Sequence, residues 1–109
     1  MQYSDFVTAT PEPQLAILAN LIFPGTGTKL SAYYKDGGIC LKTYGMGELQ
    51  NNLFEFVICS YFFTWIWWWF PFGPLIATLI TLLLHLVCFC WVQFHSYLTW
   101  KASREKYYN

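Results

Sequence analysis

The longest stretch of this chain without a charged residue lies in its second half. Residues 56–100 contain no Asp, Glu, Lys or Arg. A single helix needs about 20 apolar residues to cross the ~30 Å hydrocarbon core of a bilayer, so this stretch is long enough for two spans. Over the whole chain, 56% of residues are hydrophobic and only 11% are charged, whereas soluble domains carry about 25% charged residues. The sequence therefore predicts an all-α integral membrane protein.

The charge-free stretch is divided by the sequence "PFGP", in which Pro71 and Pro74 flank Gly73. Proline lacks a backbone N–H and clashes with the preceding turn, so it ends one helix but fits the first turn of the next. We therefore expect a helix over residues 48–70, a hairpin turn over 71–73 and a second helix over 74–100. Together they form an antiparallel helical hairpin.

The first apolar segment is shorter and is interrupted by "PGTGT", which contains Pro24, Gly25 and Gly27. Such a break is tolerated at membrane depth only where protein or water satisfies the freed backbone groups. We expect residues 13–34 to form a broken helix that crosses the membrane; a re-entrant half-helix is the alternative. The remaining parts of this single membrane domain are an N-terminal tail (1–12), an inner loop (35–47) with turns at "KDGG" and "YGMG", and a C-terminal tail (101–109).

The basic residues indicate the orientation of the hairpin. All six lie towards its open side, at Lys29, Lys35, Lys42, Lys101, Arg104 and Lys106. The positive-inside rule then places the open side in the cytoplasm or the mitochondrial matrix. A first segment that crosses would put the N-terminus on the opposite side. Because the net charge is zero, nucleic acid is not an expected partner.

Polar residues of the two predicted helices recur at alternating steps of four and three, which places them on one face of each helix. We call this face the polar seam. On 74–100 it contains Thr78, Thr81, His85, Cys88, Val92, His95 and Thr99, and on 48–70 it contains Glu48, Asn52, Glu55 and Cys59. In lipid such faces turn inwards, because an unpaired polar group in hydrocarbon is costly. Antiparallel packing makes Glu55 and His95 the first candidates for an ion pair; the alternative is that Glu55 lies at the headgroup level and stays solvated.

No set of residues predicts catalysis. His85 lies at membrane depth and is a candidate for a proton path, but no acid lies at its depth, and a neutral structural histidine is favoured. A metal site from His85, Cys88 and Cys59 lacks paired ligand spacing. "PGTGTK" lacks the spacing of a phosphate loop. We therefore expect no enzyme activity, cofactor, metal or small-molecule substrate.

Tryptophan is concentrated at the predicted hairpin turn. Trp65, Trp67, Trp68 and Trp69 precede Pro71, where an aromatic belt at the membrane–water interface explains some of them. Four tryptophans in two turns cover the whole helix circumference, and this surplus predicts contacts with neighbouring protein. Trp91 and Trp100 are further candidate interface residues, with Trp100 at the inner membrane surface.

The stretch "NLIFPGTGT" and the later "TWIWWW" resemble the Stum family of small membrane proteins, which has an Asn followed by a Pro-Gly-x-Gly-Thr break and a Trp-x-Trp segment. The residues that correspond to the break are Asn20, Pro24, Gly25, Gly27 and Thr28, and the resemblance implies a structural role for them. It also implies a ciliary or plasma-membrane protein linked to mechanosensation, without catalysis. Lys29 directly after the break departs from that pattern.

These observations support a non-enzymatic, membrane-embedded structural or scaffold protein that self-associates in the bilayer as a homo-oligomer. Two alternatives stay open. The chain fits an accessory subunit of a large hetero-oligomeric membrane complex, such as a respiratory assembly in the mitochondrial inner membrane. It also fits a channel or channel modulator in which the His85 face lines a path, which requires oligomers because two helices cannot enclose a pore.

Overall fold

The computed structural model describes residues 2–35 and 37–108, and all of its regular structure is helical. The elements in chain order are η1 (Tyr3–Phe6), α1 (Pro13–Ile22), α2 (Thr26–Ala32), α3 (Leu41–Phe62), η2 (Thr64–Trp69) and α4 (Gly73–Tyr107), where η marks a 3-10 helix. They form a rod that measures 57 × 25 × 22 Å.

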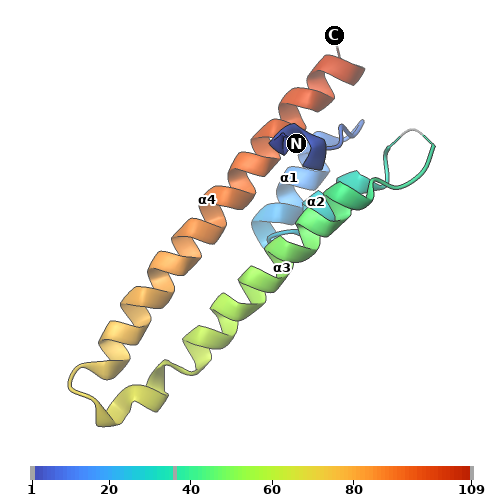
Figure 1. Ribbon diagram of the computed structural model, residues 1–109. Coiled ribbons are helices and arrows are strands. Elements are labelled where there is room, and N and C mark those ends of the chain that lie inside the picture. The colour runs from blue at the N-terminus through green and yellow to red at the C-terminus, as the bar shows by residue number, and fades with distance from the viewer. Residues whose placement is uncertain (1, 36, 109) are drawn as a thin grey trace.

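Helices α3 and α4 run antiparallel along the rod and are joined at one end by η2 (Figure 1). At the opposite end, which we call the open end, the N-terminal arm (residues 2–12) packs against the last turns of α4. The backbone N–H of Thr10 donates to Ser103 Oγ at 2.9 Å, and the Tyr108 hydroxyl donates to the Pro11 carbonyl. The N-terminal arm and the end of α4 therefore lie together.

Helices α1 and α2 fill the space between α3 and α4 at the open end (Figure 1). The chain reverses at Pro24 and Gly25, and Gly25 adopts the left-handed conformation with φ +97°. A Cβ added at Gly27 would overlap the Ala16 carbonyl, so only glycine permits this close contact between α1 and α2. The predicted break in the helix is therefore a reversal of the chain, with both ends of the segment at the open end (Figure 1).

The first helix of the hairpin differs from the prediction over residues 48–70. It begins earlier, at Leu41, so that "YGMG" is helical and the predicted inner loop over 35–47 ends by Cys40. It also ends earlier, at Phe62. The Thr64 hydroxyl donates to the Tyr61 carbonyl at 3.0 Å, which satisfies one of the last carbonyls of the helix. The tryptophans that follow lie in the separate 3-10 helix η2.

The second helix contains the predicted range 74–100 and continues to Tyr107. The turn before it falls at Phe70–Gly73, where the Gly73 N–H donates to the Phe70 carbonyl at 2.8 Å. Pro74 occupies the first turn of α4, where its missing N–H costs nothing. The expected turn residues Pro71, Gly73 and Pro74 therefore lie at the reversal, together with Phe72, whose φ is +55°.

The sequence predicts two membrane spans, but the lengths and compositions of the described helices do not show two. Within the described residues, α4 is the one helix that is long and apolar enough to cross a membrane. Its 35 residues extend about 52 Å at 1.5 Å per residue. Helix α3 is not apolar enough because its first half carries Lys42, Glu48 and the polar run Gln50–Asn52.

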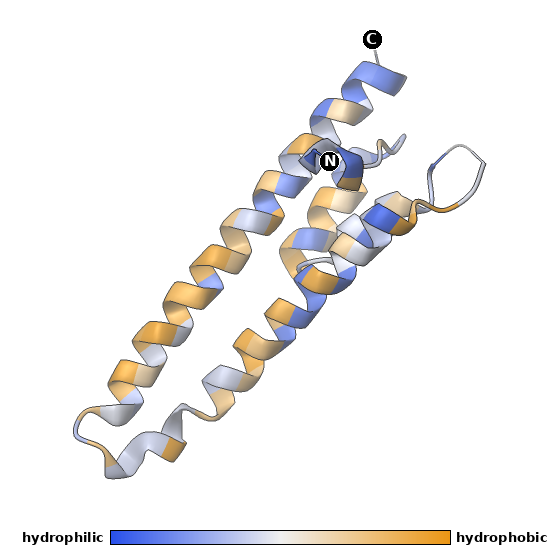
Figure 2. Ribbon diagram, viewed as in Figure 1, coloured by the Kyte–Doolittle hydropathy of each residue, from blue (hydrophilic) through white to orange (hydrophobic). Residues whose placement is uncertain are grey.

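The polarity of the molecule is inverted relative to a soluble domain. Among the described residues, the buried hydrophobic ones are Ala16, Ala32, Val57, Cys88 and Val92, whereas the buried polar ones are Thr8, Thr10, Asn20, Thr28, Ser31, Thr43, Gln50, Asn51, Thr81, His95, Ser96, Thr99 and Ser103. Leu, Ile and Phe side chains dominate the exposed surface of α4. Figure 2 shows the apolar residues over most of the rod and the hydrophilic residues near the open end.

Candidate functional site

The centre of the open end is a buried polar cluster organised by Asn20, which is 2% exposed. Its Oδ1 accepts the backbone N–H groups of Gly25, Gly27 and Thr28 at 3.0, 2.8 and 3.2 Å. These are among the donors that the first turn of a helix leaves without an intrahelical partner. Asn20 of α1 therefore caps the N-terminus of α2 from outside that helix. The cap holds together the two helices on either side of the Pro24–Gly25 break.

The same side chain connects α1 and α2 to α3 and α4. Asn20 Nδ2 donates to Ser96 Oγ at 2.9 Å and to Thr28 Oγ1 at 3.2 Å. Thr28 in turn donates its hydroxyl hydrogen to Gln50 Oε1 at 2.7 Å. A continuous chain of hydrogen bonds therefore runs through the interior and joins all four α-helices.

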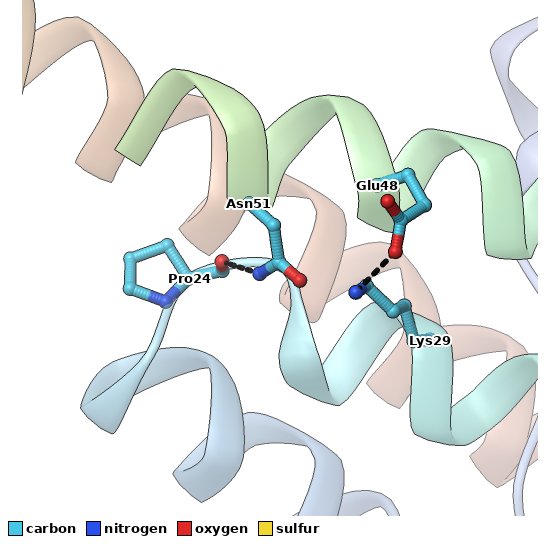
Figure 3. Close-up of polar contacts among 4 residues, drawn as sticks. All are labelled: Pro24, Lys29, Glu48 and Asn51. Atoms are coloured by element: carbon cyan, nitrogen blue, oxygen red, sulfur yellow. Dashed lines mark hydrogen bonds and ion pairs between the residues drawn. The ribbon is translucent and has the colours of Figure 1, made fainter. Parts of the chain in front are cut away.

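Two further contacts join α2 and its preceding turn to α3 (Figure 3). Asn51 Nδ2 donates to the Pro24 carbonyl, and Lys29 forms an ion pair with Glu48. Lys29, the residue that departs from the Stum pattern, thus has a partner on the neighbouring helix. Both contacts fix α3 against the point at which the chain reverses.

The N-terminal arm enters this cluster through Tyr3. Trp91 Nε1 donates to the Tyr3 hydroxyl oxygen at 2.9 Å, and the same oxygen lies 2.8 Å from His95 Nδ1. The single hydroxyl hydrogen of Tyr3 can be donated to His95 Nδ1, which assigns the ring hydrogen of a neutral His95 to Nε2. Tyr3 therefore attaches the arm to α4 through two side chains.

Two nitrogen atoms in the interior, Gln50 Nε2 and His95 Nε2, have no hydrogen-bond partner among the described residues. Both side chains are fully buried. Unpaired buried donors are costly, and their presence marks this region as the part of the interior with spare hydrogen-bonding capacity.

The predicted polar seam of the second helix lies on the buried face of α4. Thr81, Cys88, Val92, His95 and Thr99 are buried, and Thr78 and His85 are partly buried. The seam also continues beyond the predicted helix to Ser103, and Ser96 lies beside it.

The predicted seam of the first helix is displaced. Asn52, Glu55 and Cys59 are exposed and Glu48 is partly exposed. The buried face instead contains Thr43, Gly47, Gln50, Asn51 and Val57. Steps of four, three and seven lead from Thr43 to Gly47, Gln50 and Val57, so the buried face does follow helical spacing, in a register offset from that of Glu48.

The expected Glu55–His95 ion pair is therefore not formed. Glu55 lies on the exposed face of α3, while His95 contacts Tyr3. The partner of His95 is Tyr3 of the N-terminal arm, which lies 92 positions away in the sequence. No local pattern in the sequence identifies Tyr3 as that partner.

His85 lies between the two long helices and has its own tyrosine partner. The Tyr61 hydroxyl is 3.0 Å from His85 Nδ1, and the two rings meet edge to face with centroids 5.7 Å apart. The described residues contain no group of three or more His, Cys, Asp or Glu that could hold a metal ion. His85, Cys88 and Cys59 are thus not assembled as a ligand set.

The tryptophans of η2 are all exposed, from 48% for Trp67 to 75% for Trp68. Trp67 and Trp69 lie close together with ring centroids 5.8 Å apart. The other two predicted interface residues lie on α4 and are partly buried. Trp91 contacts Tyr3, and the ring of Trp100 stacks on Tyr97 and lies under the Arg104 guanidinium.

An open cavity of about 610 Å³ lies between the end of α3, η2 and the first three turns of α4. We call it the aromatic groove. Its walls include Phe56, Phe63, Trp67, Trp69, Ile80 and Leu84. The lining is almost entirely apolar, and none of its residues carries a charge.

Cys40 lies at the open end, and the pKa of its thiol is lower than the ordinary value for cysteine. Burial alone would raise its pKa. Hydrogen bonds from the side chain and backbone of Thr43 and from the Thr8 side chain, together with the charge of Lys35, lower the pKa to about 7. The Thr43 hydroxyl donates to Cys40 Sγ at 3.3 Å. A thiol with this pKa is about half thiolate at neutral pH and is nucleophilic.

Over residues 2–35 and 37–108, these features define a helical protein with one candidate transmembrane helix, a polar interior and an exposed aromatic cluster. Comparisons of the chain with protein-family models, curated proteins and solved structures give no significant match.

Proposed function

We propose that this chain is an integral membrane protein in which lipid surrounds α4, η2 and the part of α3 that follows Glu55, and in which α3 and η2 together complete a second crossing. The observation that carries this proposal is the inverted polarity: the interior is mostly polar and the exposed surface of α4 is mostly apolar. Water would make that arrangement unstable, because burial of apolar area drives folding in water. In a bilayer the same arrangement is the expected one.

The positions of charge and aromatic residues support a specific placement in the membrane. The last turns of α4 carry Lys101, Arg104 and Lys106 at the open end, which the positive-inside rule assigns to the cytoplasm or matrix. The exposed tryptophans of η2 fit the opposite interface. Helix α1 exposes Leu15, Leu18 and Leu21, so we place the α1–α2 segment in the inner leaflet as a re-entrant hairpin.

Thiol labelling in sealed vesicles tests this placement. Cys59 and Cys90 are exposed on the protein surface, but the proposal places both in hydrocarbon. Single-cysteine variants that retain either residue should not react with a membrane-impermeant maleimide until detergent is added. A variant that retains Cys40 at the open end is the matched control and should react from one side. Rapid labelling of Cys59 and Cys90 in intact vesicles would contradict the placement.

We further propose that the protein is a non-catalytic structural component that self-associates through η2. An aromatic belt at the membrane interface uses only part of the aromatic surface of η2. The two most exposed tryptophan rings of η2, Trp65 and Trp68, are 63% and 75% exposed. Exposed tryptophan of this kind is typical of interface hot spots. A channel is less favoured, because the two seam histidines are bonded to Tyr61 and Tyr3 and the seam threonines donate to backbone carbonyls of their own helix.

The mass of the purified complex in a mild detergent tests self-association. We expect a discrete homo-oligomer, and we expect Trp65→Ala with Trp68→Ala to shift it towards the monomer. Leu83→Ala removes a side chain that is 61% exposed on α4 and is the matched control. A wild-type chain that is monomeric and unstable alone would favour the accessory-subunit alternative.

The resemblance of residues 20–28 to the Stum family supports a ciliary or plasma-membrane location for this structural role. The residues that carry this resemblance are joined in the structure, because Asn20 caps the backbone N–H groups of Gly25, Gly27 and Thr28. Fluorescence microscopy of the tagged full chain tests the location, and retention in mitochondria would instead support the respiratory-assembly alternative.

A further inference from the structure

The aromatic groove has a composition that restricts what it can bind. Three hydroxyl groups line it, on Ser60, Thr64 and Thr81. Each already donates to a backbone carbonyl three or four residues earlier, at 2.8, 3.0 and 2.8 Å. The hydroxyl hydrogens are therefore engaged, and the groove offers a ligand contact area that is mainly hydrocarbon and aromatic.

The length of the groove matches one leaflet of a bilayer. Its lining on α4 extends from Gly73 to Leu84, which is about 16 Å along the helix axis at 1.5 Å per residue. Half of the ~30 Å hydrocarbon core is about 15 Å. The groove begins at η2, where the proposed placement locates the outer interface, and so it runs through one leaflet.

The electrostatics of the groove exclude recognition of a charged headgroup. Residues 56–100 contain no charged side chain, and all residues that line the groove lie in this range. At its mouth, Trp67 and Trp69 present indole rings, which suit the boundary between acyl chain and headgroup. The groove therefore selects a ligand by the apolar contact of its hydrocarbon part and by the depth at which that part lies in the membrane.

We propose that the aromatic groove binds one acyl chain of a membrane phospholipid from the leaflet that contains η2. This inference rests on the proposed membrane placement. The cavity of about 610 Å³ lies within the range of ligand sites, roughly 300–1,000 Å³. The bound chain fills the space that the small side chains of Ala77 and Thr81 leave between α4 and the end of α3.

Native mass spectrometry of the full chain, released from phosphatidylcholine nanodiscs into mild detergent, tests this proposal. The wild-type chain should retain one phospholipid. Ala77→Phe places a ring in the groove and should lower the retained fraction at least about tenfold, and Ala77→Leu should lower it less. Cys90→Phe adds the same ring at an exposed position of α4 outside the groove and should retain the lipid.

The outcomes separate this inference from the proposed function. Equal retention by Ala77→Phe and wild type, both reconstituted and helical by circular dichroism, would overturn the groove assignment. So would displacement of the phospholipid by cholesterol at an equal mole fraction, because the occupant would then be a sterol. Retention that is unchanged when phosphatidylglycerol replaces phosphatidylcholine supports selection by the acyl chain. Failure of the wild-type chain to enter nanodiscs would instead contradict the membrane placement.

Discussion

Replacement of Asn20 by alanine should be the most informative single change in this protein. The side chain accepts three backbone N–H groups and donates to two hydroxyls, and the residue is 2% exposed. Alanine removes the common acceptor and leaves the N–H groups of Gly25, Gly27 and Thr28 buried without it. The perturbation thus acts on the capped end of α2 and, through Thr28, on the contact with α3.

The magnitude follows from the number of unpaired donors. Each buried donor that loses its partner costs about 1–3 kcal/mol, so three of them cost at least about 3 kcal/mol. A domain is stable by only about 5–15 kcal/mol, so this loss is a large fraction of the total. Asn20→Asp keeps the acceptor oxygen for the three N–H groups but loses both donated bonds, and it should therefore destabilise the protein less than Asn20→Ala.

The free energy of unfolding in mixed micelles, measured by titration with a denaturing detergent and followed by tryptophan fluorescence, provides the assay. Asn52→Ala is the matched control, because Asn52 is exposed on α3 and exposed substitutions usually change stability by less than about 0.5 kcal/mol. If Asn20→Ala unfolds within about 0.5 kcal/mol of the wild type, then the cap does not organise the open end, and our account of the chain reversal is wrong.

Three further predictions concern other parts of the open end. Gly27→Ala should destabilise the protein by at least about 2 kcal/mol in the same assay, because the added methyl group would overlap α1. By contrast, the methyl group of Gly45→Ala meets no neighbour within 4 Å, and this change should stabilise α3 by roughly 0.5–1 kcal/mol. Tyr3→Phe leaves two ring nitrogens on α4 without their partner and should cost about 1–3 kcal/mol, with faster proteolysis of the N-terminal arm; unchanged proteolysis would show that the arm is held by other contacts. Cys40 should be alkylated with a rate that rises with pH through a midpoint near 7, where the thiolate forms, and Thr43→Val should move that midpoint upwards; a midpoint near 8.5, the ordinary value for cysteine, would contradict the assigned acidity.

The helix periodicity explains why one half of the polar seam was found from the sequence and the other half was not. On α4, most residues around Thr81, Cys88 and His95 are apolar, so the polar residues stand out at steps of four and three. On α3, polar residues occupy both the buried face, with Gln50 and Asn51, and the exposed face, with Asn52 and Glu55. Where both faces are polar, composition cannot distinguish them, and only contacts with α2 do so.

The sequence by itself determined the apolar, helical character of the chain, the reversal at Pro71–Pro74 and the break after Phe23, because these depend on local composition and on proline and glycine geometry. Only the tertiary structure decided the direction of the chain after that break. The left-handed φ of Gly25 and the bonds from Asn20 to the start of α2 turn the segment back, and bonds between segments distant in sequence leave no periodic signal. The partner of His95 was decided in the same way, since Tyr3 reaches it from the other end of the chain.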